Sequence, residues 1–185
     1  MEERIRTLGS IHAHHFSAHL DAVRLRTGRI TERIRMDHPQ AAAVLPFVDD
    51  GRHVLMVRQW RYAIQRETLE IPAGKVDPGE SVEVCAKREL MEETGYEAQR
   101  FLPLFRYHPA IGYSNEEIVI YAASGLDKTA RRHDTDEISR VEILPWDDVW
   151  HRVHGGTITD GKTVIALSLF KSLLDRGAVP QDFFT

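Results

Sequence analysis

Cysteine is scarce in this sequence. Its 185 residues include one cysteine, Cys85, so neither an intrachain disulfide framework nor a cysteine-rich zinc site within one chain can form. An excess of positive charge is also missing, because 24 Lys and Arg stand against 28 Asp and Glu, for a formal net charge of −4. Domains that bind nucleic acid usually carry a basic surplus, so we expect no nucleic-acid partner.

Long apolar runs are absent as well. The longest, such as residues 41–48, fall far short of the roughly 18 residues that a membrane-spanning helix needs, so we expect no membrane partner. The first ten residues contain acidic side chains and no apolar segment, which argues against a secretory signal. These features predict a soluble, reduced, cytoplasmic protein. The length suits one domain, or one domain with an added terminal element.

The first 37 residues have a weak hydrophobic pattern. Segments of loose alternation flank Thr27-Gly28, a dipeptide that favours a hairpin turn. Histidines gather there without the paired spacing of a helical zinc site, so we expect no zinc role for His12, His14 and His15. We predict a small β appendage over residues 1–37 and a main domain over residues 38–185.

The main domain mixes strands and helices. Two apolar segments, 42–48 and 53–60, flank the turn signal Asp49-Asp50-Gly51. Helical stretches follow over 81–94, with Gly95 as its natural end, and over 163–174, where Val164, Leu167, Phe170 and Leu174 share one face. Further strands are expected over 67–72, 116–124 and 140–144, and a helix over 147–153. Because strands and helices do not alternate strictly, the pattern predicts an α+β fold with a mixed sheet.

The helix over 81–94 carries an acidic face. Glu89, Glu92 and Glu93 are separated by three and four positions, so their carboxylates project from the same side. Like charges at this spacing cost a helix about 0.2–0.5 kcal/mol per pair, and a bound divalent cation would compensate. Carboxylate oxygens suit Mg²⁺ or Mn²⁺, and Mg²⁺ usually shares its coordination with substrate phosphates. The helix alone leaves a solvated acidic face equally open.

The acidic residues belong to a wider spacing pattern over residues 74–96. Its fixed positions are Gly74, Glu80, Arg88-Glu89-Leu90, Glu92-Glu93 and Gly95-Tyr96. The pattern resembles the Nudix box, with Tyr96 where an aliphatic residue is more usual. The resemblance implies the Nudix fold, an α/β/α sandwich with a mixed β-sheet. It also implies hydrolysis of a nucleoside diphosphate linked to another moiety, with divalent cations as cofactors.

The flanks of this box are more specific. Residues 57–62, 69–81 and 107–116, the last with Pro109 beyond the box, resemble the ADP-ribose pyrophosphatase branch of the family. The similarity covers most of residues 38–175. One departure is the insertion between Pro109 and Gly112, a position that bears on the preference for the terminal sugar.

The resemblance also implies a metal site and a diphosphate site. The metal ligands would be Glu89, Glu93 and the carbonyl of Ala73, with Glu92 as a third ligand or as a base, and the ion would be Mg²⁺, with Mn²⁺ as the alternative. Arg61 would grip the diphosphate, because its guanidinium fork suits phosphate oxygens. Gly74 would allow close approach of the backbone to the diphosphate, with Lys75 as a further substrate contact. Arg88 is expected to tie down the loop through a carboxylate such as Glu80.

The attacking water needs a base, and the resemblance implies that a glutamate in a loop beyond the box serves in this role. Glu137, at the end of the acidic stretch 134–137, is the first candidate, although that stretch also suits a plain surface loop. Glu116 is a second candidate and could instead contact the terminal ribose. Glu92 is the third.

The resemblance implies that the N-terminal segment exchanges between the subunits of a C₂ homodimer and helps to hold the adenine. Phe16 would supply an aromatic wall and Glu32 a polar contact.

These observations predict Mg²⁺-dependent hydrolysis of ADP-ribose, or of a related nucleoside diphosphate sugar, to AMP and a sugar phosphate. Other substrates remain open, namely GDP-mannose, NADH or an oxidised nucleoside triphosphate. A non-catalytic sensor that binds ADP-ribose is a further alternative, although a pure binder has no need of three aligned carboxylates.

Overall fold

The computed structural model describes residues 1–48, 51–129 and 138–185. It divides into two compact units, which are described separately. The first unit comprises residues 1–40 and 107–117, and the second comprises residues 41–106 and 118–185.

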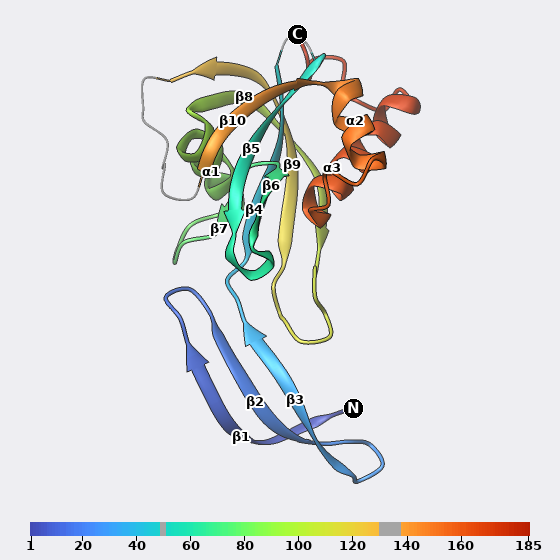
Figure 1. Ribbon diagram of the computed structural model, residues 1–185. Helices are drawn as coiled ribbons and strands as arrows, with labels where there is room; N and C mark the ends of the chain where they lie inside the picture. The colour runs from blue at the N-terminus through green and yellow to red at the C-terminus, as the bar shows by residue number, and fades with distance from the viewer. Residues whose placement is uncertain (49–50, 130–137) are drawn as a thin grey trace. The chain divides into compact units, whose positions relative to one another are not determined.

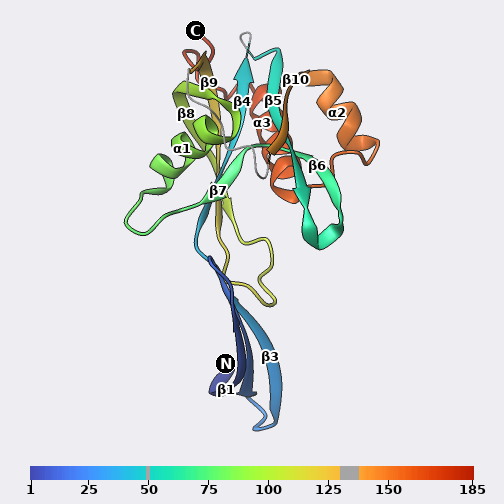
Figure 2. The same ribbon diagram turned by 60° about the vertical axis from the view of Figure 1, so that its left-hand side comes forward.

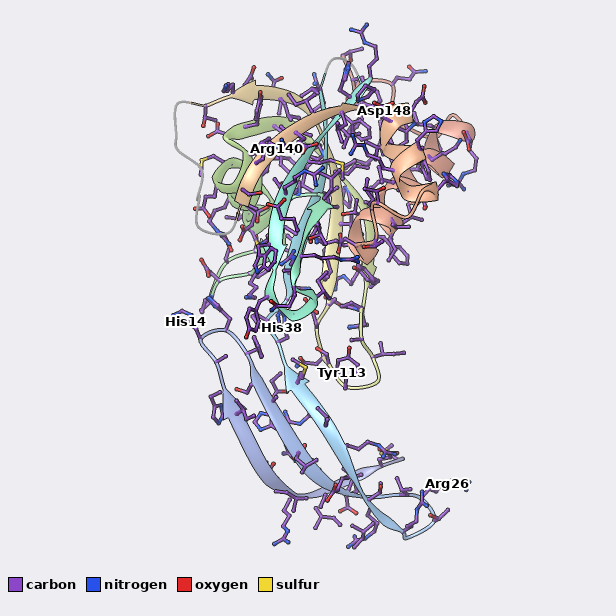
Figure 3. The ribbon with its side chains drawn as sticks, viewed as in Figure 1. His14, Arg26, His38, Tyr113, Arg140 and Asp148 are labelled. Carbon is purple, nitrogen blue, oxygen red and sulfur yellow. The ribbon has the colours of Figure 1, made fainter. Side chains whose placement is uncertain are left out.

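The first unit is built on an antiparallel sheet in the order β1-β2-β3. Its strands are β1 (Glu3–His12), β2 (Ser17–Arg24) and β3 (Ile30–Asp37). The two turns lie at opposite ends of the sheet, where Figure 3 labels His14 and Arg26. Gly28, with φ of +84°, supplies the left-handed conformation of the second turn, so the predicted hairpin is confirmed.

Polar contacts hold much of this small sheet together. Asp21 is buried and accepts hydrogen bonds from Thr7 Oγ1 at 2.7 Å and from Arg35 Nε at 2.9 Å. These two contacts, on neighbouring strands, lower the pKa of Asp21 below its usual range. Val23 is buried, whereas Ile34 is 60% exposed. Asp21 and Arg35 therefore form a partly buried ion pair that links β2 to β3, while apolar side chains such as Ile34 remain in solvent.

The second unit contains a larger mixed sheet in the order β10-β5-β4-β9-β8, with β6 beside β5 and β7 beside β4 (Figure 1). The strands are β4 (Ala41–Val48), β5 (His53–Arg61), β6 (Arg66–Glu70), β7 (Ala73–Lys75), β8 (Tyr96–Tyr107), β9 (Ile118–Lys128) and β10 (Ile138–Pro145). A short 3₁₀ turn, η1 (Tyr62–Ile64), follows β5. β4 runs parallel to β9 and antiparallel to β5 and β7.

Helices cover both faces of this sheet. Figure 2 shows α1 (Val82–Thr94) on one side, and α2 (Trp146–His154) and α3 (Gly161–Asp175) on the other. The predicted α/β/α sandwich is thereby confirmed. Within the described residues, no helix is long and apolar enough to cross a membrane.

β4 lies at the centre of the core because it is apolar on both faces. Ala42 and Val44 pack with Leu90 of α1 in one buried cluster. Phe47 instead stacks against Phe170 of α3, with ring centroids 4.4 Å apart. A strand between two helical layers needs such a continuous apolar run rather than alternation.

The ends of α1 follow from local residues. Ser81 Oγ accepts a hydrogen bond from Val84 N at 3.3 Å, and Gly95 ends the helix in the left-handed conformation at φ of +74°. Both predicted boundaries of this helix are confirmed. The predicted helix over 163–174 is confirmed as α3, and along its apolar face Leu167 and Phe170 are fully buried while Leu174, in the last turn, is 41% exposed.

A buried carboxylate, Glu70, joins β6 to β5 and α3. It accepts hydrogen bonds from Arg61 Nε at 2.8 Å, Arg61 Nη2 at 2.5 Å and Thr68 Oγ1 at 2.5 Å, and it is paired with Lys162. Burial by itself would raise the pKa of Glu70. The hydrogen bond with Arg61 and the charge of Lys162 outweigh burial and lower this pKa to about 2.

Glu70 therefore predicts a pH dependence of stability. Its folded pKa lies below the unfolded value, so its stabilising contribution is present above the unfolded pKa and is lost as the pH falls through the folded pKa. At 1.36 kcal/mol per pKa unit, the contribution at neutral pH is about 3 kcal/mol. Urea denaturation should show Glu70→Gln less stable than the wild type by about this amount at pH 7, and the gap should close as the pH approaches 2. A gap that is constant with pH would contradict this assignment.

Candidate active site

The acidic face of α1 rests on the backbone of β7. Glu93 Oε2 accepts a hydrogen bond from Ala73 N at 3.0 Å. The Glu89 carboxyl lies over Gly74, where an added Cβ would come within 1.9 Å of Glu89 Cδ. The sequence predicted that Gly74 leaves room for a diphosphate. The structure gives a different reason for this glycine, because the Glu89 carboxylate fills the space of a side chain.

Arg88 connects the helix to the loop before it. Arg88 Nε and Nη2 donate to the Glu80 carboxylate at 2.9 and 3.0 Å, and Nη2 also donates to the Lys75 carbonyl at 3.0 Å. Arg88 Nη1 donates to Glu89 at 2.7 Å and to Glu92 at 3.0 Å. The bond to Glu80 is the largest cause of a raised pKa at Arg88, and in return it lowers the pKa of Glu80. The predicted pairing of Arg88 with Glu80 is confirmed.

The ionised forms of two carboxylates on this face, Glu89 and Glu93, are disfavoured by burial. Burial, followed by the negative charge of Glu89, raises the pKa of Glu93 to about 8. Burial also raises the pKa of Glu89, whose side chain is 13% exposed. Near neutral pH the protein therefore retains a proton on Glu93 in the absence of a compensating cation.

The donor set fits a hard divalent cation. Glu89, Glu93 and the Ala73 carbonyl offer oxygen atoms only, and a cation would remove the electrostatic cost of two buried neighbouring carboxylates. The side chains are not gathered around one point, and the described residues contain no cluster of three or more acidic, His or Cys groups close enough for one ion. Glu92, at 45% side-chain exposure, is instead turned to Arg88.

Arg61 brings positive charge to this acidic face. It ends β5, its side chain is 39% exposed, and two of its nitrogens are bonded to Glu70 while Nη1 lies outside that pairing. The charges of Lys162 and Arg61 both act to lower the pKa of Glu93, against the larger effects that raise it. The predicted diphosphate arginine therefore acts electrostatically on the predicted metal ligands.

The first unit brings two of its predicted site residues together through a histidine. The Phe16 ring stacks on His38, with centroids 6.0 Å apart, and His38 Nδ1 lies 3.5 Å from Glu116 Oε1. Figure 3 labels His38 and, in the neighbouring 107–117 loop, Tyr113. Glu32 does not join them. Glu32 lies opposite Ala22 in the β2–β3 pairing, and Ala22 is six residues after Phe16. At the rise of an extended strand, Glu32 is therefore about 20 Å from Phe16 along the sheet.

Glu137 and Lys75 are two further predicted site residues. Glu137 and its stretch 134–137 lie outside the described residues. Lys75 is half-buried in β7, where its carbonyl accepts from Arg88, and the function of its side chain stays a prediction.

Sequence reasoning missed His38, Glu70 and Lys162. Lys162 did carry a usable signal, because a cation in the first turn of a helix faces the positive end of the helix dipole and needs a reason to be there. His38 and Glu70 gave no such signal, since their contacts form only in the folded chain.

Comparison with known proteins identifies the family of this chain. The model of the NUDIX domain matches residues 37–166. The chain is 33% identical over 151 residues to the ADP-ribose pyrophosphatase of Bacillus subtilis (strain 168), across 80% of this chain and 81% of that protein. It is 36% identical over 150 residues to the methanol dehydrogenase activator of Bacillus methanolicus, across 80% of each chain. A crystal structure of an ADP compounds hydrolase superposes with a TM-score of 0.77 at 25% identity, across 96% of this chain and 98% of that one. With the acidic helix, the glycine loop and the sandwich in place, and with the family model spanning most of the sequence, this chain belongs to the Nudix family.

Proposed function

We propose that this protein is a Mg²⁺-dependent hydrolase that cleaves the diphosphate bond of ADP-ribose or a related nucleoside diphosphate sugar, giving AMP and a sugar phosphate. The observation that carries the proposal is the pair of neighbouring carboxylates, Glu89 and Glu93, packed on the backbone of β7, where burial outweighs the nearby cations and raises the pKa of both groups. The similarity to an ADP-ribose pyrophosphatase and to an ADP compounds hydrolase supports the substrate class.

Glu89, Glu93 and the Ala73 carbonyl would hold the ion, with Glu92 as a third ligand or as a base. When bound, Mg²⁺ or Mn²⁺ supplies charge neutralisation for the phosphate oxygens. Arg88 keeps the helix and the loop in register around these groups. The protein's own contribution is thus a set of positioned oxygen atoms, and a bound cation would favour the ionised form of Glu93.

Arg61 is the residue we assign to the diphosphate. Glu70 holds one edge of its guanidinium, which limits the directions in which the other edge can point. A planar fork of this kind pairs with phosphate oxygens better than a lysine point charge does. Gly74 and Lys75 follow Ala73 in β7 and are proposed as further substrate contacts.

The proton of the attacking water requires an acceptor. Glu137 is our first candidate, followed by Glu116 and Glu92. Single Gln variants separate these roles, because the variant of the base loses kcat while its Mn²⁺ affinity stays at the wild-type value. Loss of Mn²⁺ affinity would instead mark a ligand.

We also propose a homodimer whose interface includes the first unit. Cross-strand neighbours Gly9, Leu20 and Ile34 lie on one face of the three-stranded sheet, which is hollowed by a volume of about 480 Å³. An apolar hollow of this kind suits burial against a second copy. Phe16, already stacked on His38, is the proposed aromatic contact for the adenine base.

A panel of nucleotides tests the proposed activity most simply. With Mg²⁺ present, ADP-ribose should give AMP and ribose 5-phosphate, identified by chromatography, with higher kcat/KM than GDP-mannose, NADH or an oxidised nucleoside triphosphate. Tight ADP-ribose binding without turnover would favour the sensor. Faster turnover of another compound would reassign the substrate.

A nucleotide substrate and a reduced, buried Cys85 both suit a cytoplasmic protein, which we propose as its location.

The metal assignment predicts the effect of removing one ligand charge. Glu93→Gln preserves size and helix propensity but loses an anionic oxygen, so kcat/KM for ADP-ribose should fall by about 100-fold or more while circular dichroism is unchanged. EDTA should abolish wild-type activity, and Mg²⁺ or Mn²⁺ should restore it. Glu83→Gln is the matched control, because Glu83 lies exposed on the same helix and pairs with Lys87. Near wild-type turnover by Glu93→Gln would refute the assignment.

The assignment of Arg61 predicts a change in binding more than in chemistry. If Arg61 contacts the diphosphate equally in the ground and transition states, Arg61→Ala should raise KM by about tenfold or more with a smaller change in kcat. Arg61→Lys should restore part of the loss, since a point charge cannot reproduce the fork. Steady-state kinetics that leave kcat/KM of Arg61→Ala at the wild-type value would remove Arg61 from the site.

The dimer proposal predicts that one buried charge separates the subunits. Ile34→Asp places a carboxylate on the apolar face and should give a monomer in light scattering, with weaker ADP-ribose binding in calorimetry. Thr27→Asp adds the same charge in the exposed turn and should stay dimeric. Deletion of residues 1–35 should likewise give a monomer that keeps its Mg²⁺ site. A monomer that binds ADP-ribose as tightly as the wild type would contradict the shared pocket.

A further inference from the structure

Lys162 is a cation in an unusual place. It lies in the first turn of α3, where the helix dipole disfavours positive charge, and its side chain is 8% exposed. Lysine is almost never buried unless it is paired. Here its ammonium group is bonded to the Glu70 carboxylate and lies 3.1 Å from Asp160 Oδ2. The burial of Lys162 is therefore stabilised by two acidic partners.

These residues form a four-charge cluster, namely Arg61, Lys162, Glu70 and Asp160. Its two cations and two carboxylates balance, so the cluster as a whole is neutral. Its members differ in access to solvent, because the side chains of Lys162 and Glu70 are 8% and 3% exposed while that of Arg61 is 39% exposed. Arg61 is therefore the group through which this cluster meets a ligand.

Glu70 divides its negative charge between two cations. Its Oε2 atom accepts from Arg61 Nη2 and also from the Lys162 ammonium. Without Lys162, Arg61 and Glu70 would form a closed neutral pair with little attraction for an anion. With Lys162 present, Glu70 neutralises Arg61 only in part, so the electrostatic potential at the exposed edge of the guanidinium is more positive.

The position of α3 does not depend on the lysine charge alone. Asp160 Oδ2 accepts from Thr163 N at 3.0 Å and from Thr163 Oγ1 at 2.6 Å, which caps the helix. Thr163 Oγ1 in turn accepts from Ile71 N at 3.0 Å, just before the Ala73 backbone of the active site. An Asn at position 160 can accept the same hydrogen bonds without the charge, so geometry and charge can be separated by experiment.

We propose that Lys162 is a positioning residue for the substrate diphosphate: by sharing Glu70 with Arg61, it leaves the charge of the Arg61 guanidinium incompletely neutralised, so that Arg61 attracts and orients the phosphate oxygens. The inference rests on the proposed function, because it assumes that Arg61 meets a diphosphate. It adds α3 to the elements that determine affinity, although Lys162 itself does not contact the substrate.

The first test removes the charge of Lys162. In the full-length protein with Mg²⁺ and ADP-ribose, Lys162→Met should raise KM by about tenfold and leave kcat within about twofold, because uniform binding is weakened. Lys162→Arg, which retains the charge, should recover most of the affinity. Lys171→Met removes the same charge from an exposed site on the same helix and should leave both constants unchanged.

The second test uses a variant that should lower KM instead of raising it. Asp160→Asn keeps the helix cap and removes one negative charge from the cluster, so Lys162 neutralises more of Glu70 and KM should fall. A purely structural role would make both variants worse. An unchanged KM in folded Lys162→Met, or an unchanged or higher KM in Asp160→Asn, overturns the proposal. If Lys162→Met fails to fold, Asp160→Asn decides alone. Wild-type protein that does not hydrolyse ADP-ribose refutes the proposed function instead, which is a separate outcome.

Discussion

The candidate site depends on the hydrogen bonds that the Arg88 guanidinium makes to the loop, the strand and the helix around it. The guanidinium binds the loop through Glu80, the strand β7 through the Lys75 carbonyl, and its own helix through Glu89 and Glu92. Because a guanidinium has five donors in a rigid plane, one side chain can fix all these groups at once. A helix with three aligned carboxylates would otherwise repel itself and leave the glycine loop unattached.

Arg88 does not remove the whole electrostatic cost. Glu93 lies deeper than Arg88 reaches, and its pKa of about 8 records burial beside the Glu89 charge. Arg61 and Lys162 reduce this cost from the other side, through the cluster around Glu70. Arg88 therefore positions the carboxylates of the acidic face, and Arg61 and Lys162 reduce the electrostatic cost of ionising Glu93. A divalent ion would neutralise the negative charge that these three cations leave uncompensated. This balance connects the fold to the proposed chemistry, because Arg61 and Lys162, which hold Glu70 of β6, also influence the electrostatic environment of Glu93, a proposed metal ligand.

The sequence predicted the parts of the molecule whose information is local. The helix predicted over 81–94, which forms over 82–94, and its end at Gly95 follow from composition and spacing within one segment, and the pairing of Arg88 with Glu80 follows from the resemblance of that segment to the Nudix box. β8 was missed because it lies at the edge of the sheet and contains Pro103, which is typical of edge strands and weakens a strand pattern. The contacts of Glu70 with Lys162, 92 residues apart, could not be predicted, because nothing in either segment identifies its partner. His38 was hidden for the same reason, since its stacking on Phe16 depends on how β2 and β3 pair.

We propose that Glu89, which lies over Gly74, and Glu93, which is bonded to the Ala73 backbone, form a site for a divalent cation. The most direct measurement is a calorimetric titration of Mn²⁺ into the metal-free wild type and Gly74→Ala. A Cβ at position 74 would collide with the Glu89 carboxyl, so Gly74→Ala should remain folded yet bind Mn²⁺ about tenfold or more weakly. Equal Mn²⁺ affinity in the two proteins, or no Mn²⁺ binding by the wild type at millimolar concentration, would contradict the account.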